Sequence, residues 1–257
     1  MISLKSKREI EIMRESARKL KLIFRELKQF VKAGMTTIEI DQKAQRLMEA
    51  QEVKPAFKGY RGYPACVCTS INEEVVHGIP SNRKIKEGDI LSLDIGLIHE
   101  GYYSDSARTW TIGYVSEEAL ELIEAARRAL YIGMAQMKPG NRLGDVSYAI
   151  QNYVESNGFS VIRDYVGHGI GRTMHEDPQV PNFGKPGRGP KLEVGMVLAI
   201  EPMVAAGSWE IDVLDDAWTV VTRDRQLSAH YEDTIALTEH GPENLTGPQE
   251  YREESEE

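Results

Sequence analysis

The chain has 257 residues, of which 41% are hydrophobic and 28% charged, and its formal net charge at pH 7 is −9. This length suits one large domain or two tightly joined halves around a sizeable core. The acidic balance argues against a DNA-binding protein driven by bulk electrostatics. No segment reaches the ~18 apolar residues of a membrane span, and the start lacks the apolar core of a signal peptide. With only Cys66 and Cys68, the chain has no disulfide framework, so we expect a cytoplasmic protein.

Two helices are predicted at the N-terminus and a third near the middle of the chain. The first has an apolar face of Met13, Ala17, Leu20, Phe24, Leu27 and Val31, and we expect it to end at Gly34. The sequence TTIE at 36–39 is a capping box, which predicts the start of the second helix. Ser116 begins the third predicted helix, with Ala119, Ile123, Ala126, Leu130, Met134 and Met137 on one face.

The second part of the chain repeats the first. KPGNRLGDVSYAIQNYVESNG (138–158) parallels KAGMTTIEIDQKAQRLMEAQE (32–52), and VGMVLAIEPM (194–203) parallels EGDILSLDIG (87–96). EAARR (124–128) likewise parallels ESARK (15–19). One such match can arise by chance, but several in the same order favour a duplication. We therefore predict related halves at about 1–113 and 114–248, facing one another, followed by an acidic tail at 249–257.

Four acids occupy related places in the two halves. Asp94 ends an apolar strand, and the repeat pairs it with Glu201, while Asp105 and Glu232 each follow a tyrosine in a predicted strand. A lone buried carboxylate costs several kcal/mol or becomes protonated. Four that converge must be relieved by protonation or by cations, and two divalent ions of Mn, Fe, Co or Zn would balance their charge.

Three histidines lie in glycine-rich or proline-adjacent stretches. His168 lies between glycines, where the backbone can approach a metal closely, His175 follows it, and His77 occurs in VVHGIP. Taken singly, each histidine suits a solvated loop or a core position, each acid a helix cap or an ion pair, and the glycines a turn. Their combination with symmetric acids favours a transition-metal site, because imidazole is a poor ligand for calcium.

These residues occur within motifs that resemble a known family. The motifs are SINEEVVHGIP, GDILSLDIG with GYYSDSART, YVGHGIGRTMHEDPQVPN, GMVLAIEPM and SAHYEDTIALTEHGPENLT. From about residue 3 to residue 246, the sequence resembles the type I methionine aminopeptidases of the compact bacterial kind, which are pita-bread metallopeptidases. The resemblance implies an α+β pita-bread fold: two pseudo-symmetric halves, an antiparallel sheet covered by helices, and a binuclear metal site at the centre of a single catalytic domain, 1–248.

The resemblance also implies the reaction and the residues that perform it. The enzymes hydrolyse the initiator methionine from nascent proteins with a small second residue, using water activated by two divalent ions (Co, Mn, Fe or Zn). The implied metal ligands are Asp94, Asp105, His168, Glu201 and Glu232. Glu201 would also shuttle a proton, and His77 and His175 would contact the substrate and stabilise the tetrahedral intermediate.

The methionine pocket of the family corresponds to Tyr60, Tyr63, Cys68 and Trp218 in this chain, although ordinary core packing also explains such residues. Three positions depart from the family pattern. Met174 replaces a frequent aromatic residue before His175, and His230 and Asp233 flank Glu232, where they can alter its hydrogen bonds and the metal affinity. Cys66 has no predicted role.

Two other functions compete with this prediction. A proline-specific peptidase on the same scaffold would use the same ligands, but such proteins usually carry an additional N-terminal domain. A non-catalytic binding protein would be expected to have lost ligands. The expected partner is the N-terminus of a nascent chain, and the expected state is a monomer. The basic residues Lys185, Arg188 and Lys191 suggest a ribosome-facing loop, for which a solvated loop is the simpler interpretation.

Overall fold

The computed structural model describes residues 2–247, so the predicted acidic tail at 249–257 lies outside the described residues. The helices are α1 (Lys7–Phe30), α2 (Thr37–Ala50), α3 (Glu117–Ala135) and α4 (Leu143–Ser156), with a 3₁₀ turn, η1, at Tyr60–Gly62. The strands of the first half are β1 (Lys54–Pro55), β2 (Val67–Ile71), β3 (Glu74–Val76), β4 (Ile90–His99) and β5 (Tyr102–Thr111). Those that follow are β6 (Ser160–Val161), β7 (Gly167–Gly169), β8 (Glu176–Val180), β9 (Val197–Ile200), β10 (Met203–Ala205), β11 (Ile211–Val213), β12 (Val220–Thr222), β13 (Ser228–His230), β14 (Glu232–Thr238) and β15 (Gly241–Asn244).

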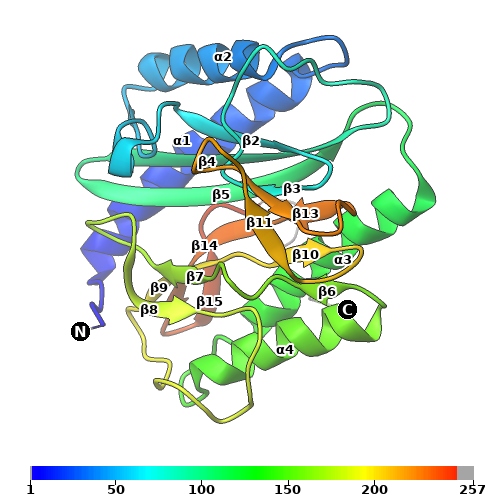
Figure 1. The fold of residues 1–257 in the computed structure, drawn as a ribbon. Helices are drawn as coiled ribbons and strands as arrows, with labels where there is room; N and C mark the ends of the chain where they lie inside the picture. Colours follow the sequence, from blue (N-terminus) through cyan, green and yellow to red (C-terminus); the bar gives the residue numbers. More distant parts are fainter. Residues whose placement is uncertain (1, 248–257) are drawn as a thin grey trace, which may run out of the picture.

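The main sheet joins a strand pair from each half of the chain. Its order is β1-β4-β5-β14-β9-β7-β8, with β2 also paired to β4 and β15 to β14. The antiparallel pair β4–β5 comes from the first half of the chain and the antiparallel pair β9–β14 from the second, and β5 joins β14 between them. This arrangement confirms the two pseudo-symmetric halves, visible in Figure 1 with α1 and α2 on one side and α3 and α4 on the other. The predicted boundary at 113–114 falls in the connection between β5 and α3.

Each half of the sheet is covered by its own helix pair. In the first half, Leu91, Leu93 and Ile95 of β4 are buried against α1 and α2. In the second, Leu198 and Ile200 of β9 are buried with residues of α3 and α4. Because side chains alternate along a strand, the residues between these large ones point to the opposite face. The helices therefore cover one face of the sheet, and the predicted acidic ligands lie on the other.

The helix boundaries follow local chemistry. Ser6 and Glu9 form a capping box at the start of α1. The predicted box of α2 is confirmed, because Glu39 accepts hydrogen bonds from the backbone N and Oγ1 of Thr36. The expected end of α1 at Gly34 was wrong, since Val31 already has extended dihedrals and its N–H donates to the carbonyl of Leu27.

The predicted face of α3 was partly wrong. Its buried residues are Ala119, Leu122, Ala125, Ala126, Ala129, Leu130 and Gly133, whereas Ile123 and Met134 are only half-buried. Packing against α4 decides this orientation: a Cβ added at Gly133 would lie 2.8 Å from the Ile150 side chain. The helix thus turns Gly133 toward α4, an orientation that apolar spacing alone does not indicate.

Candidate metal centre and substrate cavity

Strand register brings two predicted ligands into one row. Cys68 on β2 pairs with Asp94 on β4, Asp94 pairs with Ala107 on β5, and Ala107 pairs with Glu232 on β14. The small, fully buried Ala107 therefore separates two carboxylates that point to the same face. Residues more than a hundred positions apart in sequence become neighbours through this pairing.

A second row on the same face holds Asp105 and His168. Thr234 Oγ1 accepts from the backbone N of Asp105 at 3.0 Å and donates to its carbonyl at 2.8 Å, which joins β5 to β14. Thr234 then pairs with Ala199 on β9, and Ala199 pairs with His168 on β7. Glu201 follows the last residue of β9 directly. All five predicted ligands thus converge on one face from five different segments.

The ligand atoms of the cluster lie close together. Those of Asp105, His168 and Glu232 are all within 4.8 Å of one another. His168 Nε2 is 3.8 Å from Asp105 Oδ2 and 3.7 Å from Glu201 Oε1. Two buried oxygens, Asp94 Oδ1 and Glu232 Oε1, have no hydrogen-bond partner. Buried oxygens without donors are those that a cation would satisfy.

Burial and mutual repulsion perturb the cluster strongly. Burial, with the charge of neighbouring carboxylates, raises the pKa of Asp94 to about 7 and that of Asp105 well above its usual range. Burial raises the pKa of Glu201 to about 8, and burial with the Asp105 charge raises that of Glu232. Burial lowers the pKa of His168 to about 3, which keeps the imidazole neutral and able to bind a metal. Crowded carboxylates with one neutral imidazole fit divalent transition-metal ions.

The glycines beside His168 allow close packing of strand β7. A Cβ added at Gly167 would lie 2.4 Å from the Ala199 carbonyl oxygen, and one at Gly169 would lie 2.2 Å from that of Asp177. Strand β7 is thus held so tightly between β8 and β9 that side chains are excluded on both sides of His168.

His175 lies against His168 of the carboxylate–histidine cluster. Its ring centroid is 4.3 Å from that of His168, and its Nδ1 is 2.8 Å from the hydroxyl of Tyr60, whose ring stacks on it. The adjacent Glu176 forms a largely buried ion pair with Lys5, at 2.6 Å. This ion pair anchors the loop that carries His175 to the N-terminal segment.

His77 approaches the cavity from a strained turn. Its φ of 62° is in the left-handed region, which costs a non-glycine residue about 1–2 kcal/mol. The following Gly78 cannot carry a side chain, because its Cβ would lie 2.2 Å from the Thr69 carbonyl oxygen. Burial lowers the pKa of His77 to about 4, so the ring is neutral. Strain that the surrounding structure maintains is common at functional positions.

One cavity of about 230 Å³ contains all the predicted site residues. The predicted residues in its lining are Tyr60, Tyr63, Cys68, His77, Asp94, Asp105, His168, His175, Glu201, Trp218 and Glu232. Its apolar wall also includes Met174 and the unpredicted Phe57 and Tyr165. The sequence offered a weak signal for both, since Phe57 precedes Tyr60 in an aromatic-rich stretch and Tyr165 precedes His168 by three residues.

The two cysteines have different environments. Cys68 lines the cavity but is only 4% exposed, and burial raises the pKa of its thiol, so it remains protonated and unreactive. Cys66 is fully buried in the core beneath α2, where its backbone N donates to Asp41 Oδ1 at 2.8 Å. Cys66 therefore contributes to packing beneath the site.

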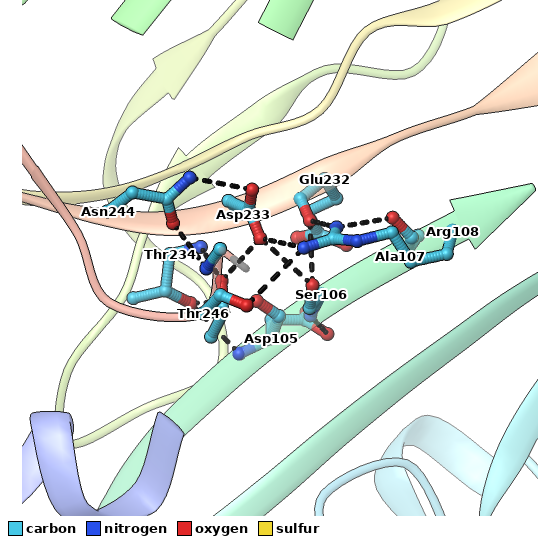
Figure 2. Close-up of polar contacts among 10 residues, drawn as sticks. Asp105, Ser106, Ala107, Arg108, Glu232, Asp233, Thr234, Asn244 and Thr246 are labelled. Atoms are coloured by element: carbon cyan, nitrogen blue, oxygen red, sulfur yellow. Dashed lines mark hydrogen bonds and ion pairs between the residues drawn. The ribbon is translucent and has the colours of Figure 1, made fainter. Parts of the chain in front are cut away.

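A polar network supports the cluster from the opposite face of the sheet (Figure 2). Asp233, fully buried, accepts hydrogen bonds from Arg108 Nη2 at 2.6 Å, Thr246 Oγ1 at 2.7 Å, Asn244 Nδ2 at 2.8 Å and Ser106 Oγ at 3.1 Å. The carbonyl of Glu232 accepts from Arg108 Nη1 at 2.6 Å and from Ser106 Oγ at 2.8 Å. The backbone of Glu232 is thus held from behind, which orients its carboxylate toward the cavity.

Comparison with known proteins identifies the family. The model of metallopeptidase family M24 matches residues 11–239. This chain belongs to metallopeptidase family M24. The M24 assignment implies the use of a divalent metal, as the unpartnered carboxylates also indicate.

Similar proteins extend over nearly the full length of this M24 chain. A methionine aminopeptidase of Clostridium perfringens is 52% identical over 246 residues, covering 96% of this chain and 99% of that protein. The crystal structure of methionine aminopeptidase from Thermotoga maritima is 47% identical, with a TM-score of 0.94 and coverage of 96% and 100%. Prolidase from Pyrococcus furiosus shares the fold at 23% identity, with a TM-score of 0.78 and coverage of 96% and 66%. The predicted family resemblance and pita-bread fold are confirmed. Within residues 2–247, no helix is long and apolar enough to cross a bilayer.

Proposed function

We propose that this M24 chain hydrolyses the N-terminal methionine from polypeptides whose second residue is small. The main support for this proposal is a single cavity that combines a carboxylate-rich cluster with an aromatic wall. One side suits divalent ions and a free amino group, and the other suits an unbranched thioether. The names of the similar full-length proteins agree with this activity.

Asp94, Asp105, His168, Glu201 and Glu232 would hold two divalent ions, from among Co, Mn, Fe and Zn. When bound, the ions would supply Lewis acidity and lower the pKa of a water molecule. Glu201 directly follows buried strand β9 and lies beside His168, and its carboxylate can take a proton from the attacking water and transfer it to the leaving amine. General acid–base assistance of this kind contributes about 10²–10⁴-fold in rate.

The two histidines outside the ligand set would act on the scissile carbonyl. The Tyr60 hydroxyl is 2.8 Å from His175 Nδ1, and in the tautomer in which Nδ1 accepts this hydrogen bond, Nε2 carries the proton and can donate within the cavity. His77 lies among the aromatic residues, with its ring centroid 5.4 Å from that of Tyr165 and 6.2 Å from that of Trp218. Both neutral rings can donate hydrogen bonds to the oxyanion that forms in the transition state.

The apolar wall would select methionine. Tyr63, Cys68 and Met174 are buried in one cluster, and the half-buried Tyr60 and Trp218 pack against it. Sulfur–aromatic contacts favour a thioether side chain by about 0.3–1.5 kcal/mol each. The limited cavity volume favours a small second residue.

We also propose that the enzyme acts as a cytoplasmic monomer on nascent chains. Lys185, Arg188 and Lys191 are exposed in the loop that follows β8, which supports this loop as a candidate ribosome contact. A charge-reversed variant with glutamate at all three positions would be tested for co-sedimentation with ribosomes, against the wild-type chain at the same ionic strength.

The activity is tested by mass spectrometry of three peptides that begin with Met-Ala, Met-Pro and Ala-Pro. Chelator-stripped protein would be incubated with each peptide before and after Mn²⁺ or Co²⁺ is added. We expect metal-dependent loss of methionine with Ala-Pro intact. Release of alanine from Ala-Pro would instead support a proline-specific peptidase, and no cleavage with any metal would support a binding protein.

A further inference from the structure

His230 is a buried imidazole in the cavity that the five predicted ligands do not account for. It ends β13, is 2% exposed and lines the same cavity. Its backbone is fixed by Thr109, whose Oγ1 accepts from the His230 N–H at 2.9 Å and donates to its carbonyl at 3.0 Å. The ring nitrogen Nε2 is buried and has no hydrogen-bond partner.

The position of His230 mirrors that of His168. His168 Nε2 lies 3.7 Å from Glu201 Oε1, and His230 Nε2 lies 3.6 Å from Glu201 Oε2. The two imidazoles thus contact opposite oxygens of one carboxylate. Metal bonds to His nitrogen and carboxylate oxygen are about 2.0–2.2 Å long, so ligand atoms up to about 4.4 Å apart can share an ion. Both pairs satisfy that limit.

Simpler roles for His230 do not fit its surroundings. A hydrogen bond to Glu201 is excluded by the 3.6 Å separation, which exceeds the usual N–H···O range. An ordinary core histidine would have its nitrogen satisfied, since an unpaired buried polar atom costs about 1–3 kcal/mol. His230 and Asp94 line the same cavity, and Asp94 Oδ1 is also buried without a partner. The lining of this cavity therefore includes an unpaired nitrogen and an unpaired oxygen.

We propose that His230 Nε2 is an additional metal ligand, shared with Glu201, so that each of the two ions receives one imidazole. This inference rests on the proposed metal centre. A second imidazole makes the donor set richer in nitrogen, which shifts the preference of the ion that His230 binds toward Zn²⁺ or Co²⁺ and away from Mn²⁺.

The first test is calorimetric titration of the chelator-stripped full chain with Zn²⁺ and, separately, with Mn²⁺. The variant His230→Gln keeps a polar side chain of similar length but removes the imidazole. We expect one equivalent of Zn²⁺ to bind at least 10-fold more weakly to the variant, and Mn²⁺ affinity to change by less than that. His99→Gln, which removes a histidine outside the cavity, serves as the matched control and should bind both ions as the wild type does.

The second test is NMR spectroscopy of the histidine rings, and its main result comes from the wild-type protein. Wild-type protein labelled with ¹⁵N-histidine would be titrated with Zn²⁺. Two imidazole nitrogens should then appear in the metal-bound chemical-shift range, one from His168 and one from His230. The His230 signal should be absent from His230→Gln. Identical Zn²⁺ isotherms for wild type and variant, or a single metal-bound imidazole in the wild type, would overturn the role of His230 while leaving the proposed peptidase intact. A wild-type chain that binds neither ion would overturn both proposals.

Discussion

Glu232 and Asp233 are consecutive residues whose carboxylates lie on opposite faces of β14. Glu232 points into the cavity, where Oε1 has no partner and where burial with neighbouring charges raises its pKa. Asp233 points to the helix-covered face, where four donors satisfy it and Arg108 neutralises it. Burial is nearly complete for both. The two carboxylates differ in whether they have hydrogen-bond and charge partners. A buried acid with partners stabilises the strands, whereas a buried acid without them indicates a binding site.

The same contrast holds on β5. Asp105 faces the cluster with a raised pKa caused by burial and by Asp94. Its neighbour Ser106 faces the other way and donates to Asp233 and to the carbonyl of Glu232. Alternation along two paired strands thus builds a supporting network and a functional cluster from adjacent residues.

The largest effect is expected on the cavity face, for Glu201→Gln. The amide keeps the shape of the side chain but cannot shuttle a proton, so kcat for methionine release should fall about 10²–10⁴-fold. Turnover of a Met-Ala peptide would be measured together with bound metal by elemental analysis. Normal turnover at full metal content would show that the assigned role of Glu201 is wrong.

On the opposite face, Asp233→Asn should destabilise the fold. The change leaves Arg108 buried without its counter-charge, for which a loss of about 3–5 kcal/mol in the free energy of unfolding is typical. Urea unfolding of metal-free protein measures it. The control is Asp212→Asn, where a half-exposed ion pair with Arg223 is removed and a change below about 1 kcal/mol is expected. Equal effects of the two substitutions would show that the buried Asp233–Arg108 pair contributes no more to stability than an exposed ion pair.

Glu232→Gln should act in the opposite direction on stability. Because burial and neighbouring carboxyls raise the pKa of Glu232, folding of the metal-free chain near pH 7 must protonate it, which costs stability. A neutral amide removes this cost, so the free energy of unfolding of the metal-free protein should rise by about 1 kcal/mol, the size of a typical substitution effect. The same variant should gain less thermal stability than the wild type when Co²⁺ is added, because a predicted ligand is lost. Thermal unfolding with and without Co²⁺ checks both. A destabilised metal-free variant would show that Glu232 is satisfied in the folded chain.

A smaller effect is expected for Tyr60→Phe. The substitution removes the 2.8 Å contact to His175 Nδ1 and leaves the stacked ring in place. Losing one hydrogen bond of about 0.5–1.5 kcal/mol corresponds to roughly a 2–10-fold decrease in kcat/KM. Peptide kinetics would be compared with those of Tyr114→Phe, at a residue that is 93% exposed. An unchanged kcat/KM would indicate that Tyr60 does not orient His175.

The smallest effect is expected at Glu9, a satisfied acid near the surface. Hydrogen bonds from Tyr102 and from Ser6 lower its pKa to about 2. A lowered pKa in the folded state contributes stability that is complete above the unfolded value of about 4.3 and is lost as the pH falls toward 2. Glu9→Gln should therefore be less stable than the wild type at pH 7 by less than about 1 kcal/mol, and the difference should shrink at pH 3. Urea unfolding at both pH values checks this, and a pH-independent difference would contradict it.

Much of this protein could be predicted from local patterns in the sequence. Period-2 alternation placed Asp94 opposite the large apolar residues of its strand, and the repeat paired it with Glu201. The capping box at Thr36 determined the start of α2. Such features depend on neighbours within a few residues, which is why composition and spacing reveal them.

Other features were decided only by tertiary structure. The network around Asp233 joins residues of β5 to residues more than a hundred positions later, and the orientation of α3 depends on contact between Gly133 and Ile150. The unsatisfied nitrogen of His230 has no local signature in the sequence. Strand register and helix packing determine which distant side chains meet and which polar atoms stay unpaired, and both depend on the whole fold.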